Sequence, residues 1–507
     1  GIERVLNIIA SKVQEGEKIA VVVSAREMAT DQLEGILELA SSGRDYQTAF
    51  EKFESYQRHS FKNVDLSKEF KELVQLLEGI ALLGDYSLKI KDQVLALGEL
   101  ISTKLITKLL IGKGIEAELL DSRLLIKTDA TYGDAKVLEA VSQAQVTQAF
   151  SELANGVVPI IPGFIGATLK NETTTLGRNG SNYTASMIAN YLDAEELQNY
   201  THVDGIYTAD PQLVPEARRI EQLSYSEANE LANFGATILH AKTIIPLLEK
   251  NIPLRILNTF NDNNEGTLIS AKTTKEGIRS LSVLENEALI NVEGRGLLGK
   301  VGVDARIFRA LSQKNVSVSI ISQGSSERGI GLLVAANKAQ IAKEALEIEF
   351  EHDFKSKDIN SITIVEDVSV ISIVGQDLST FHKPYNALIK NQIVPLLFNN
   401  TVSGKNISLV VHKADLHKAM NVMHGQIFGI SKKVNLAVFG HGNVGSTLLD
   451  QILRASKNIE KRKGTQLNIF ALANSKKLLL DKNGISRHWR TSIKEEGSAY
   501  ILGDVID

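Results

Sequence analysis

The feature that most constrains the fold of this chain is the alternation of apolar runs and helical patterns in its first half. The run 18–25 (KIAVVVSA) is continuously apolar and lies between Glu17 and Arg26, as in a strand that is buried on both faces of a sheet. Strand and helix signals then alternate as far as residue 257. We therefore predict an α/β domain with a mainly parallel sheet and helices on both of its faces. An α/β unit normally opens with a strand, whereas this segment opens with a helix over 2–13, so we expect that its first strand is missing.

The helix and strand signals of this half are separate from one another along the sequence. Helical patterns cover 2–13, 32–39, 45–56 and most of 66–111. The strand and helix signals that follow cover 118–119, 156–164, 184–192, 196–202, 227–234, 242–249 and 254–257.

Two similar units follow a polar turn at 261–266 and an expected linker at 271–277. The first unit has strands at 278–292, 316–323 and 331–336 and helices at 303–313 and 338–350, and the second repeats this plan with segments at 368–374, 386–391, 394–398, 406–412 and 415–424. This βαββα repetition predicts two small ferredoxin-like α+β units packed as a pair.

Composition and charge exclude several classes of protein. A chain of 507 residues is too long for one hydrophobic core, and its 43% hydrophobic and 23% charged residues are ordinary for a soluble globular protein. The formal net charge of -4, without a long basic run, argues against a nucleic-acid or membrane partner. Cysteine is absent, which excludes disulfides and thiolate metal sites and favours a cytoplasmic protein.

The segment 173–184 (TTTLGRNGSNYT) carries the clearest chemistry, because glycines and hydroxyls precede a helix that we expect to begin near Ala185. Backbone N–H groups and the helix dipole favour an anion at such a place, and Arg178 adds a fork of donors for phosphoryl or carboxylate groups. By composition alone, a polar loop that caps the helix is the favoured interpretation.

The order of residues in this segment is more specific, because it resembles the T-T-L-G-R-G-G-S-D-Y-S/T-A signature of aspartate kinases, within the amino-acid kinase family. Further segments resemble that family in the same order along the chain, namely 98–103 (GELIST), 163–166 (GFIG), 201–211 (THVDGIYTADP), 234–240 (FGATILH) and 251–268. The resemblance covers almost the whole first half. It implies an αβα sandwich that transfers the γ-phosphoryl group of ATP, with Mg²⁺, to the β-carboxylate of L-aspartate, and it implies no metal site made by protein ligands.

The resemblance also implies roles for individual residues. Glu99 would bind the ammonium group of aspartate and Arg178 its carboxylate, with Ser24 and Thr30 lining the pocket. The expected nucleotide positions are Gly180, Ser181, Thr201, His202, Val203, Gly205, Tyr207 and Gln212. Asn182 stands with Arg178 at the catalytic positions of the signature.

Four departures from the family bear on activity. The family's K-F-G-G loop, with its phosphate-binding lysine, should precede Ile2 but is absent from this sequence. The turn 26–31 (REMATD) has no glycine, whereas the family has a glycine-rich turn there. Asn182 replaces an aspartate and cannot act as a base. In the nucleotide segments His202, Gln212 and Thr237 stand where the family has Asp, Arg and Lys. Loss of these charges weakens an electrostatic site, so the alternative function is a kinase-fold scaffold that senses amino acids and supports assembly.

The paired units resemble ACT domains, the amino-acid-sensing modules of this family, through segments 293–308 and 318–327 (VSIISQGSSE). The resemblance implies that Gln323, with Ile321 beside it, binds an effector, which we expect to be threonine. Asn400 in segment 397–401 (LFNNT) is the corresponding position of the second unit. Paired ACT units imply a homo-oligomer, a dimer or a tetramer.

The last region carries a glycine motif at 440–445 (GHGNVG), directly after an apolar strand at 434–439 and before a helix through 446–454. This strand–motif–helix order is typical of a dinucleotide-binding fold. The region resembles the start of homoserine dehydrogenase, which implies that NADP or NAD binds through Gly440, Gly442, Asn443, Val444, Gly445, Asn474 and Ser475. Lys476 and Lys477, without an acidic residue after the next strand, favour NADP.

Taken together, these segments resemble the bifunctional aspartokinase–homoserine dehydrogenase family. We expect a kinase domain at 1–272, two ACT units at 273–430 and the first part of a Rossmann domain at 431–507. Because 507 is reached before any dehydrogenase catalytic region, reduction of aspartate semialdehyde to homoserine is expected of a longer protein only. The paired ACT units and the glycine motif argue against a kinase that acts on another amino acid, such as glutamate.

Overall fold

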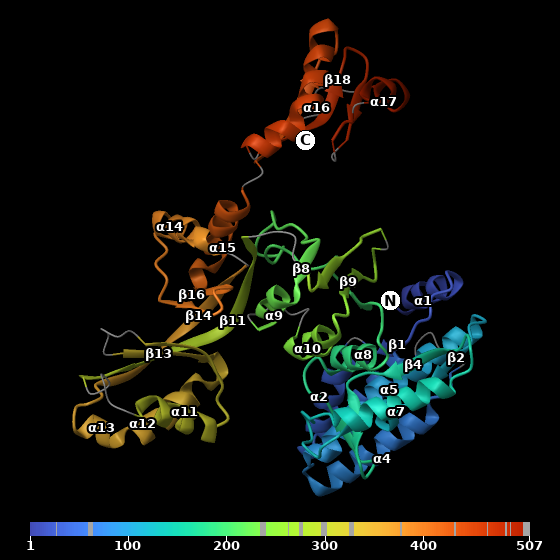
Figure 1. Cartoon of the computed structure of the whole chain (residues 1–507), viewed down its shortest axis with the longest axis vertical. Coiled ribbons are helices and arrows are strands. Elements are labelled where there is room, and N and C mark those ends of the chain that lie inside the picture. The colour runs from blue at the N-terminus through green and yellow to red at the C-terminus, as the bar shows by residue number, and fades with distance from the viewer. Residues whose placement is uncertain are drawn as a thin grey trace. The chain divides into compact units, whose positions relative to one another are not determined.

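The computed structural model describes residues 1–26, 28–58, 64–233, 240–261, 263–272, 277–295, 302–323, 329–375, 378–429, 432–463, 465–481, 484–486 and 488–499. The chain divides into two compact units. Figure 1 labels the helices and strands of both. The first comprises Gly1–Tyr207 and Arg219–Ser282 with a short piece near Val374, and the second comprises Thr208–Arg218, Val283–Ile373 and Asp377–Asp507. The segment Thr208–Arg218 therefore belongs with the second unit although both of its neighbours in the chain belong to the first.

The first unit is the expected α/β domain. Its helices are α1 (Ile2–Gln14), α2 (Ala29–Ser41), α3 (Gln47–Arg58), α4 (Ser67–Leu83), α5 (Leu88–Gly112), α6 (Ser122–Leu125), α7 (Glu139–Glu152), α8 (Gly180–Tyr191), α9 (Tyr225–Asn233) and α10 (Ala241–Lys250). Its strands are β1 (Val21–Val23), β2 (Ala117–Leu119), β3 (Lys127–Thr128), β4 (Val158–Pro162), β5 (Ile165–Thr168), β6 (Thr173–Thr175), β7 (Leu197–Thr201), β8 (Gln222–Ser224), β9 (Leu254–Asn258) and β10 (Thr267–Ser270).

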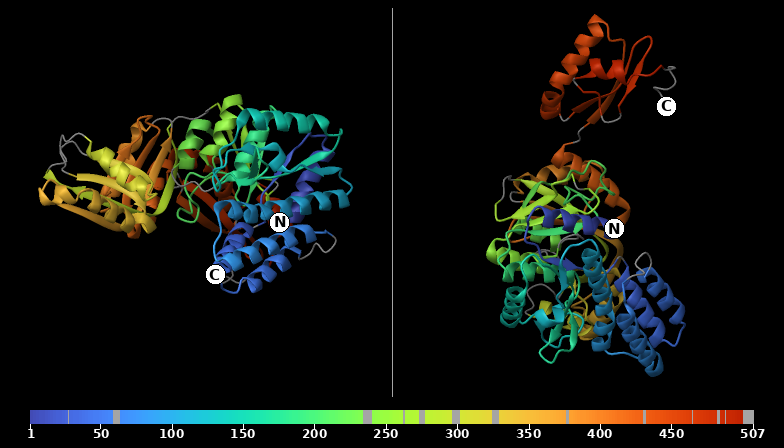
Figure 2. Two further views of the ribbon diagram at one scale, coloured as in Figure 1. Left: turned by 90° about the horizontal axis from the view of Figure 1, so that it is seen from below. Right: turned by 90° about the vertical axis from the view of Figure 1, so that its right-hand side faces the viewer.

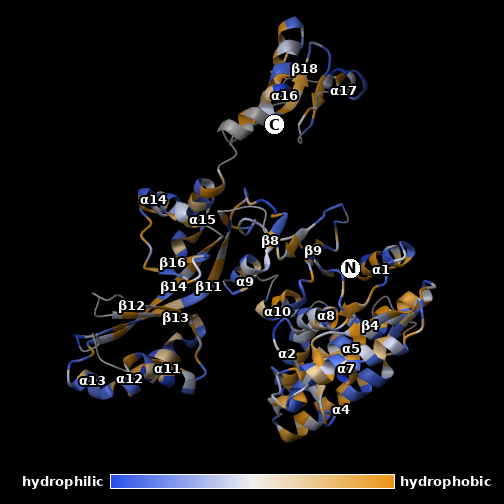
Figure 3. Cartoon of the chain, viewed as in Figure 1, coloured by the Kyte–Doolittle hydropathy of each residue, from blue (hydrophilic) through white to orange (hydrophobic). Residues whose placement is uncertain are grey.

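The strands form a parallel sheet in the order β1-β4-β2 and a mixed sheet in the order β7-β9-β10-β8, in which only β9 and β10 are antiparallel neighbours. A third small sheet has the order β3-β5-β6. Helix α5 is central to the packing, because its side chains join a buried cluster with α2 and α4. Hydrophobic and hydrophilic residues alternate around α4, and its apolar side is buried in the same cluster (Figure 3).

Two expectations about this unit were wrong in detail. The run 18–25 forms only a three-residue strand, and Val21–Val23 are half-buried instead of fully buried. The reason is that β1 is an edge strand of its sheet and pairs with β4 alone among the described strands. The helix expected near Ala185 begins at Gly180, because Asn179 takes a left-handed conformation with φ 58° and turns the chain into the helix early.

The paired βαββα units form one continuous sheet of six strands in the order β12-β13-β11-β14-β16-β15. The strands are β11 (Ile278–Glu293), β12 (Val318–Gln323), β13 (Gly329–Ala335), β14 (Ser361–Gly375), β15 (Leu397–Asn400) and β16 (Asn406–His412), and the helices are α11 (Val303–Gln313), α12 (Ala339–Glu349), α13 (Glu351–Lys355), α14 (His382–Lys390) and α15 (Lys413–Phe428). The expected pairing of two units is confirmed, and the long strands β11 and β14 at the centre of the sheet join the two repeats.

The last region contains β17 (Lys432–Phe439), α16 (Asn443–Lys463), β18 (Thr465–Ala473), β19 (Leu478–Leu480) and α17 (Trp489–Glu495). Strands β17 and β18 are parallel and are connected by α16, which contacts β18 (Figure 2). This is the βαβ order expected of a dinucleotide-binding fold. Across the described residues, no helix is both long and apolar enough to cross a membrane.

Candidate active site

The segment that follows β1 lies directly on the middle of α5. The Ala25 side chain packs so closely that a Cβ atom added at Gly98 would be 3.2 Å from the Cβ atom of Ala25. The Arg26 N–H donates to Ser102 Oγ at 3.0 Å. Ser24, exposed, and Thr30, half-buried at the start of α2, therefore flank the stretch of α5 that carries Glu99.

Glu99 is a buried carboxyl group with one oxygen unused by the protein. Its side chain is 3% exposed, and Oε1 accepts a long hydrogen bond of 3.4 Å from the Ala25 N–H. Its other oxygen, Oε2, has no hydrogen-bond partner among the described residues. Burial raises the pKa of Glu99 to about 8, and the Ala25 N–H only partly opposes this shift. A buried carboxylate in this condition is costly to keep ionised unless a cation joins it.

Helix α8 begins against the ends of β1 and β4. The Gly163 N–H donates to the Val23 carbonyl oxygen at 2.8 Å, and a Cβ atom added at Gly163 would be 2.6 Å from the Cβ of Ser181. Phe164 donates its N–H to Thr184 Oγ1 at 3.1 Å, and a Cβ atom on Gly180 would be 2.7 Å from the Phe164 ring. Only glycine fits at these two close approaches, so the GFIG segment and the start of α8 are packed together.

The start of α8 offers backbone donors in a positive environment. The first N–H groups of a helix have no partners within the helix, and here they belong to the half-buried Ser181 and Asn182 among others. Arg178 is exposed just before them. Burial lowers the pKa of His240, and the charges of Lys242 and Arg178 lower it further. The charge of Arg178 therefore acts at the start of α10 as well, where the Asp134 carboxylate opposes it. The helix start and Arg178 together are suited to an anion.

Two residues that support this loop were missed from the sequence. Lys242 contacts the Asp134 carboxylate and donates to the Leu176 carbonyl oxygen at 3.4 Å. Buried Asp92 of α5 accepts hydrogen bonds from the N–H and the hydroxyl of Thr175. Asp92 could have been noticed as an aspartate among the apolar residues of a helix. Lys242 gave no such signal, because a basic residue in a helical pattern is common.

The expected nucleotide segment leaves the carboxyl end of β7. Thr201 and Val203 are half-buried, His202 is exposed, and burial raises the pKa of the half-buried Tyr207. Gly205 has φ 137°, and a Cβ atom there would be 2.5 Å from Thr267 Oγ1, so only glycine fits. Gln212 is exposed. It belongs to the second unit, whereas the five expected nucleotide residues from Thr201 to Tyr207 belong to the first. Thr237 lies outside the described residues.

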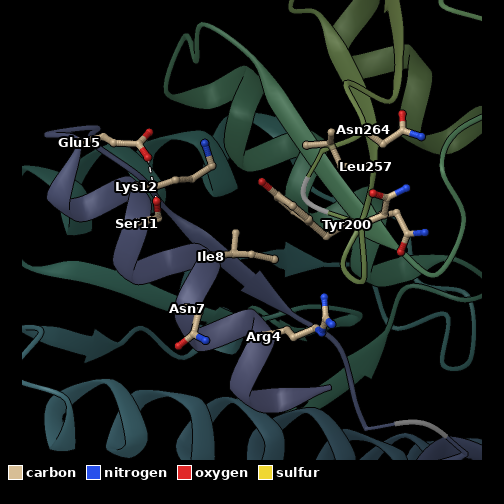
Figure 4. Close-up of a pocket in the computed structure, with 11 residues that line it drawn as sticks. Arg4, Asn7, Ile8, Ser11, Lys12, Glu15, Tyr200, Leu257 and Asn264 are labelled. Atoms are coloured by element: carbon tan, nitrogen blue, oxygen red, sulfur yellow. Dashed lines mark hydrogen bonds between the residues drawn. The ribbon is translucent and has the colours of Figure 1, made fainter. Parts of the chain in front are cut away.

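A cavity of about 690 Å³ lies in the same unit between α1 and the ends of β7 and β9 (Figure 4). Arg4, Asn7 and Lys12 line it from α1, and Tyr200 and Asn258 line it from β7 and β9. None of the predicted site residues contributes to its wall. The cavity borders β7, which is an edge strand of its sheet.

The expected effector residues lie on the two outer strands of the six-stranded sheet. Gln323 is exposed at the end of β12, where it is in register with Ile330 of β13, and Ile321 is half-buried two positions earlier. Asn400 is exposed at the end of β15. Residues 324–328 lie outside the described part of the chain.

The glycine motif of the last region forms a tight turn between β17 and α16. Gly440 has φ 93°, and a Cβ atom on Gly445 would be 1.9 Å from the Gly440 carbonyl oxygen. Gly442 precedes the helix, and Asn443 and the exposed Val444 begin it. The turn leaves backbone at the helix start free of side-chain bulk, and these residues fit a dinucleotide pyrophosphate.

Asn474 fixes the neighbouring turn. Its side-chain oxygen accepts the N–H groups of Lys476 and Lys477 at 2.8 and 2.7 Å, and its Nδ2 lies 2.9 Å from Nε2 of His441 in the glycine motif. Ser475 is exposed beside it. Asn474 therefore connects the two turns on which the cofactor residues were predicted.

The chain is similar to known proteins over most of its length. It is 32% identical over 438 residues to a bifunctional aspartokinase/homoserine dehydrogenase of Haemophilus influenzae. The matched part is 85% of this chain and 53% of the relative. The chain thus spans about half the length of this relative. Residues 290–350 match an ACT domain.

Solved structures agree with the fold. The crystal structure of E. coli aspartokinase III in complex with aspartate and ADP has a TM-score of 0.70 and 26% identity, over 84% of this chain and 96% of that one. The same enzyme in complex with lysine and aspartate has a TM-score of 0.67 and 25% identity, with the same coverage. The match to the amino acid kinase family extends over residues 1–258, half of the chain, and the chain therefore belongs to the amino acid kinase family.

Proposed function

We propose that this chain phosphorylates the β-carboxylate of L-aspartate with Mg-ATP, giving 4-phospho-L-aspartate and ADP. The observation that carries the proposal is Glu99, whose buried Oε2 has no partner in the described part of the chain and is suited to the ammonium group of an amino acid. The similarity to an aspartokinase crystallised with aspartate and ADP supports the same substrates.

The other roles follow from the chemistry of the transfer. Arg178 would bind the α-carboxylate of aspartate through a paired fork of hydrogen bonds, with Ser24 and Thr30 beside it. The turn at Gly180 and Ser181 would approach the phosphates, with the Ser181 N–H as donor, because the Gly180 N–H already donates to the Gly177 carbonyl oxygen. Thr201, His202, Val203, Gly205 and Tyr207 would hold the nucleotide. Phosphoryl transfer depends on this positioning and on charge neutralisation.

The replacement of an aspartate by Asn182 is compatible with this reaction. The attacking group is a carboxylate with a pKa of about 3.9, so it is already ionised at neutral pH and no base has to remove a proton. Asn182 can still donate a hydrogen bond to a phosphate or carboxylate oxygen.

For the whole protein, we propose reduction of aspartate semialdehyde to homoserine with NADPH, and feedback by threonine bound at Gln323. The glycine turn at Gly440–Gly445 supports the dinucleotide, which would supply the hydride, and Lys476 and Lys477 support its 2′-phosphate. A homo-oligomer formed through the ACT units is part of the same proposal. Calorimetry that gives heat with lysine but none with threonine would reject the choice of effector.

The decisive experiment is a coupled ADP-release assay on the full-length protein with aspartate, with glutamate as the alternative substrate. We expect turnover that depends on aspartate and is lost in Arg178→Ala. Binding of ADP without any turnover would show that the chain is a kinase-fold scaffold. Turnover with glutamate alone would assign it to another branch of the family.

A further inference from the structure

The segment Thr208–Arg218 comes directly after Tyr207 of the nucleotide segment, yet it packs with the second unit. Thr208 is 9% exposed, and its Oγ1 lies 2.8 Å from Nε2 of His424, which is 1% exposed on α15. Further along the segment, the Leu213 carbonyl oxygen accepts a hydrogen bond of 2.8 Å from Nδ2 of Asn421, one turn earlier on the same helix. Helix α15 therefore holds this segment at two points.

The hydrogen bonds around Thr208 close the segment into a loop. Thr208 donates its N–H to the Arg218 carbonyl oxygen at 2.8 Å, and its Oγ1 accepts the Arg218 N–H at 2.9 Å. The hydroxyl hydrogen is thus left for the ring nitrogen of His424. Both ends of the loop are thus held together at one residue, Thr208, whose hydroxyl is also bonded to His424 of α15.

His424 is suited to a fixed structural contact. Burial lowers its pKa, and the charge of Arg218 lowers it further, so the ring is neutral and Nε2 can accept a hydrogen bond. Its ring also packs on Phe428, with 4.7 Å between the ring centroids. Exchange of this buried contact for water is therefore costly.

Tyr207, the residue before Thr208 in the chain, is held by the first unit. Its carbonyl oxygen accepts a hydrogen bond of 2.8 Å from Ser280 Oγ, at the beginning of β11. The chain thus passes at Tyr207–Thr208 from a residue expected to bind ATP to a residue fixed by the second ACT repeat.

We propose that His424 is a positioning residue for ATP, which acts through Thr208 and links α15 of the second ACT repeat to the nucleotide segment. The proposal rests on the function proposed above for Tyr207. By linkage, a ligand that shifts α15 changes the affinity for ATP, and ATP changes the affinity for that ligand by the same factor.

The test compares His424→Ala, His424→Gln and Thr208→Val with His412→Ala, which removes an exposed histidine just before α15. We measure the affinity of the full-length protein for Mg-ADP by calorimetry, KM for ATP and for aspartate, kcat and Tm. His424→Ala and Thr208→Val should each weaken ADP binding and raise KM for ATP roughly five- to tenfold, as expected for one buried hydrogen bond. His424→Gln should restore much of this loss, and kcat and KM for aspartate should stay unchanged.

The double variant His424→Ala/Thr208→Val should be no worse than either single variant, because both remove the same contact. A fall in Tm and kcat with an unchanged KM for ATP would show a merely structural role and overturn the proposal. An equal effect in His412→Ala would overturn it as well. If the wild-type protein shows no aspartate-dependent turnover, the proposed function fails, and the calorimetric comparison with ADP still decides the role of His424.

Discussion

The raised pKa of Glu99 predicts how kcat/KM for aspartate depends on pH. Its pKa of about 8 means that the carboxyl group is mostly protonated at neutral pH before substrate binds. An ammonium group needs the ionised form, so binding of aspartate below pH 8 must release a proton. The value of kcat/KM for aspartate should therefore rise with pH until the group is ionised.

The size of the effect follows from the same pKa. The ionised fraction of Glu99 rises from about 1% at pH 6 to about half at pH 8, so kcat/KM for aspartate should rise about fiftyfold across this range. In Glu99→Gln the rise should disappear, and kcat/KM at pH 8 should fall by on the order of a hundredfold, because the buried ammonium loses its partner. Glu78→Gln, which changes an exposed carboxylate on α4, is the matched control and should behave as wild type.

Stability gives a second measurement of the same group. Because the folded pKa is raised above the ordinary value of 4.5, the unfolded chain loses its proton first as pH rises. The free energy of unfolding should therefore fall relative to Glu99→Gln by about 1.4 kcal/mol per pH unit between pH 4.5 and pH 8, and stay constant outside this window. The total difference is about 5 kcal/mol, measured by denaturant unfolding at several values of pH.

A flat pH profile for aspartate in the wild-type protein would refute this account of Glu99. So would a Glu99→Gln variant that is less stable than wild type at pH 9, since the carboxylate would then be stabilising. Isothermal calorimetry in two buffers of different ionisation enthalpy measures proton release directly, and a value of zero at pH 7 would lead to the same conclusion.

Three further outcomes are expected. Arg178→Ala should lower kcat/KM for aspartate at least roughly hundredfold with little change in Tm, because the side chain is exposed, and a change of less than threefold would remove Arg178 from the site. Gly163→Ala should lower both Tm and activity, because its Cβ atom would be 2.6 Å from the Cβ of Ser181; unchanged crystal coordinates of α8 in the variant would contradict this. Gly445→Ala should abolish NADP binding by the full-length protein, since its Cβ atom would be 1.9 Å from the Gly440 carbonyl oxygen, whereas kinase activity should persist; fluorescence titration with NADPH checks the first and ADP release the second.

Long periodic segments could be predicted from the sequence with good bounds. Helix α11 occupies the expected 303–313, and strand β16 the expected 406–412, because in both the apolar residues follow the period of the element. The glycine turn before α16 was also expected, since an apolar strand, the motif and a helix occur in direct succession.

Elements whose buried side chains are polar could not be predicted. Thr173–Thr175 was interpreted as part of a polar loop, yet it forms strand β6 and is buried. Its hydroxyl groups find partners far away in the chain, with Thr175 bonded to Asp92 and Thr174 2.8 Å from Thr128. Periodicity carries no information about such long-range partners.

The candidate site shows the same limit. The family resemblance singled out Glu99. It gave no sign that one carboxylate oxygen is buried and has no partner among the residues that the structure describes. The packing of Thr208–Arg218 with the second unit could not be predicted either, because it depends on the contact of Thr208 with His424, 216 residues later in the chain.

The shared sheet of the ACT repeats constrains how this protein can be divided or shortened. Strands β11 and β14, of 16 and 15 residues, are neighbours at its centre, so removal of either repeat would expose a long row of unpaired backbone groups. Such an edge invites pairing with another chain and aggregation. Natural shortening and laboratory truncation should therefore keep or discard both repeats together.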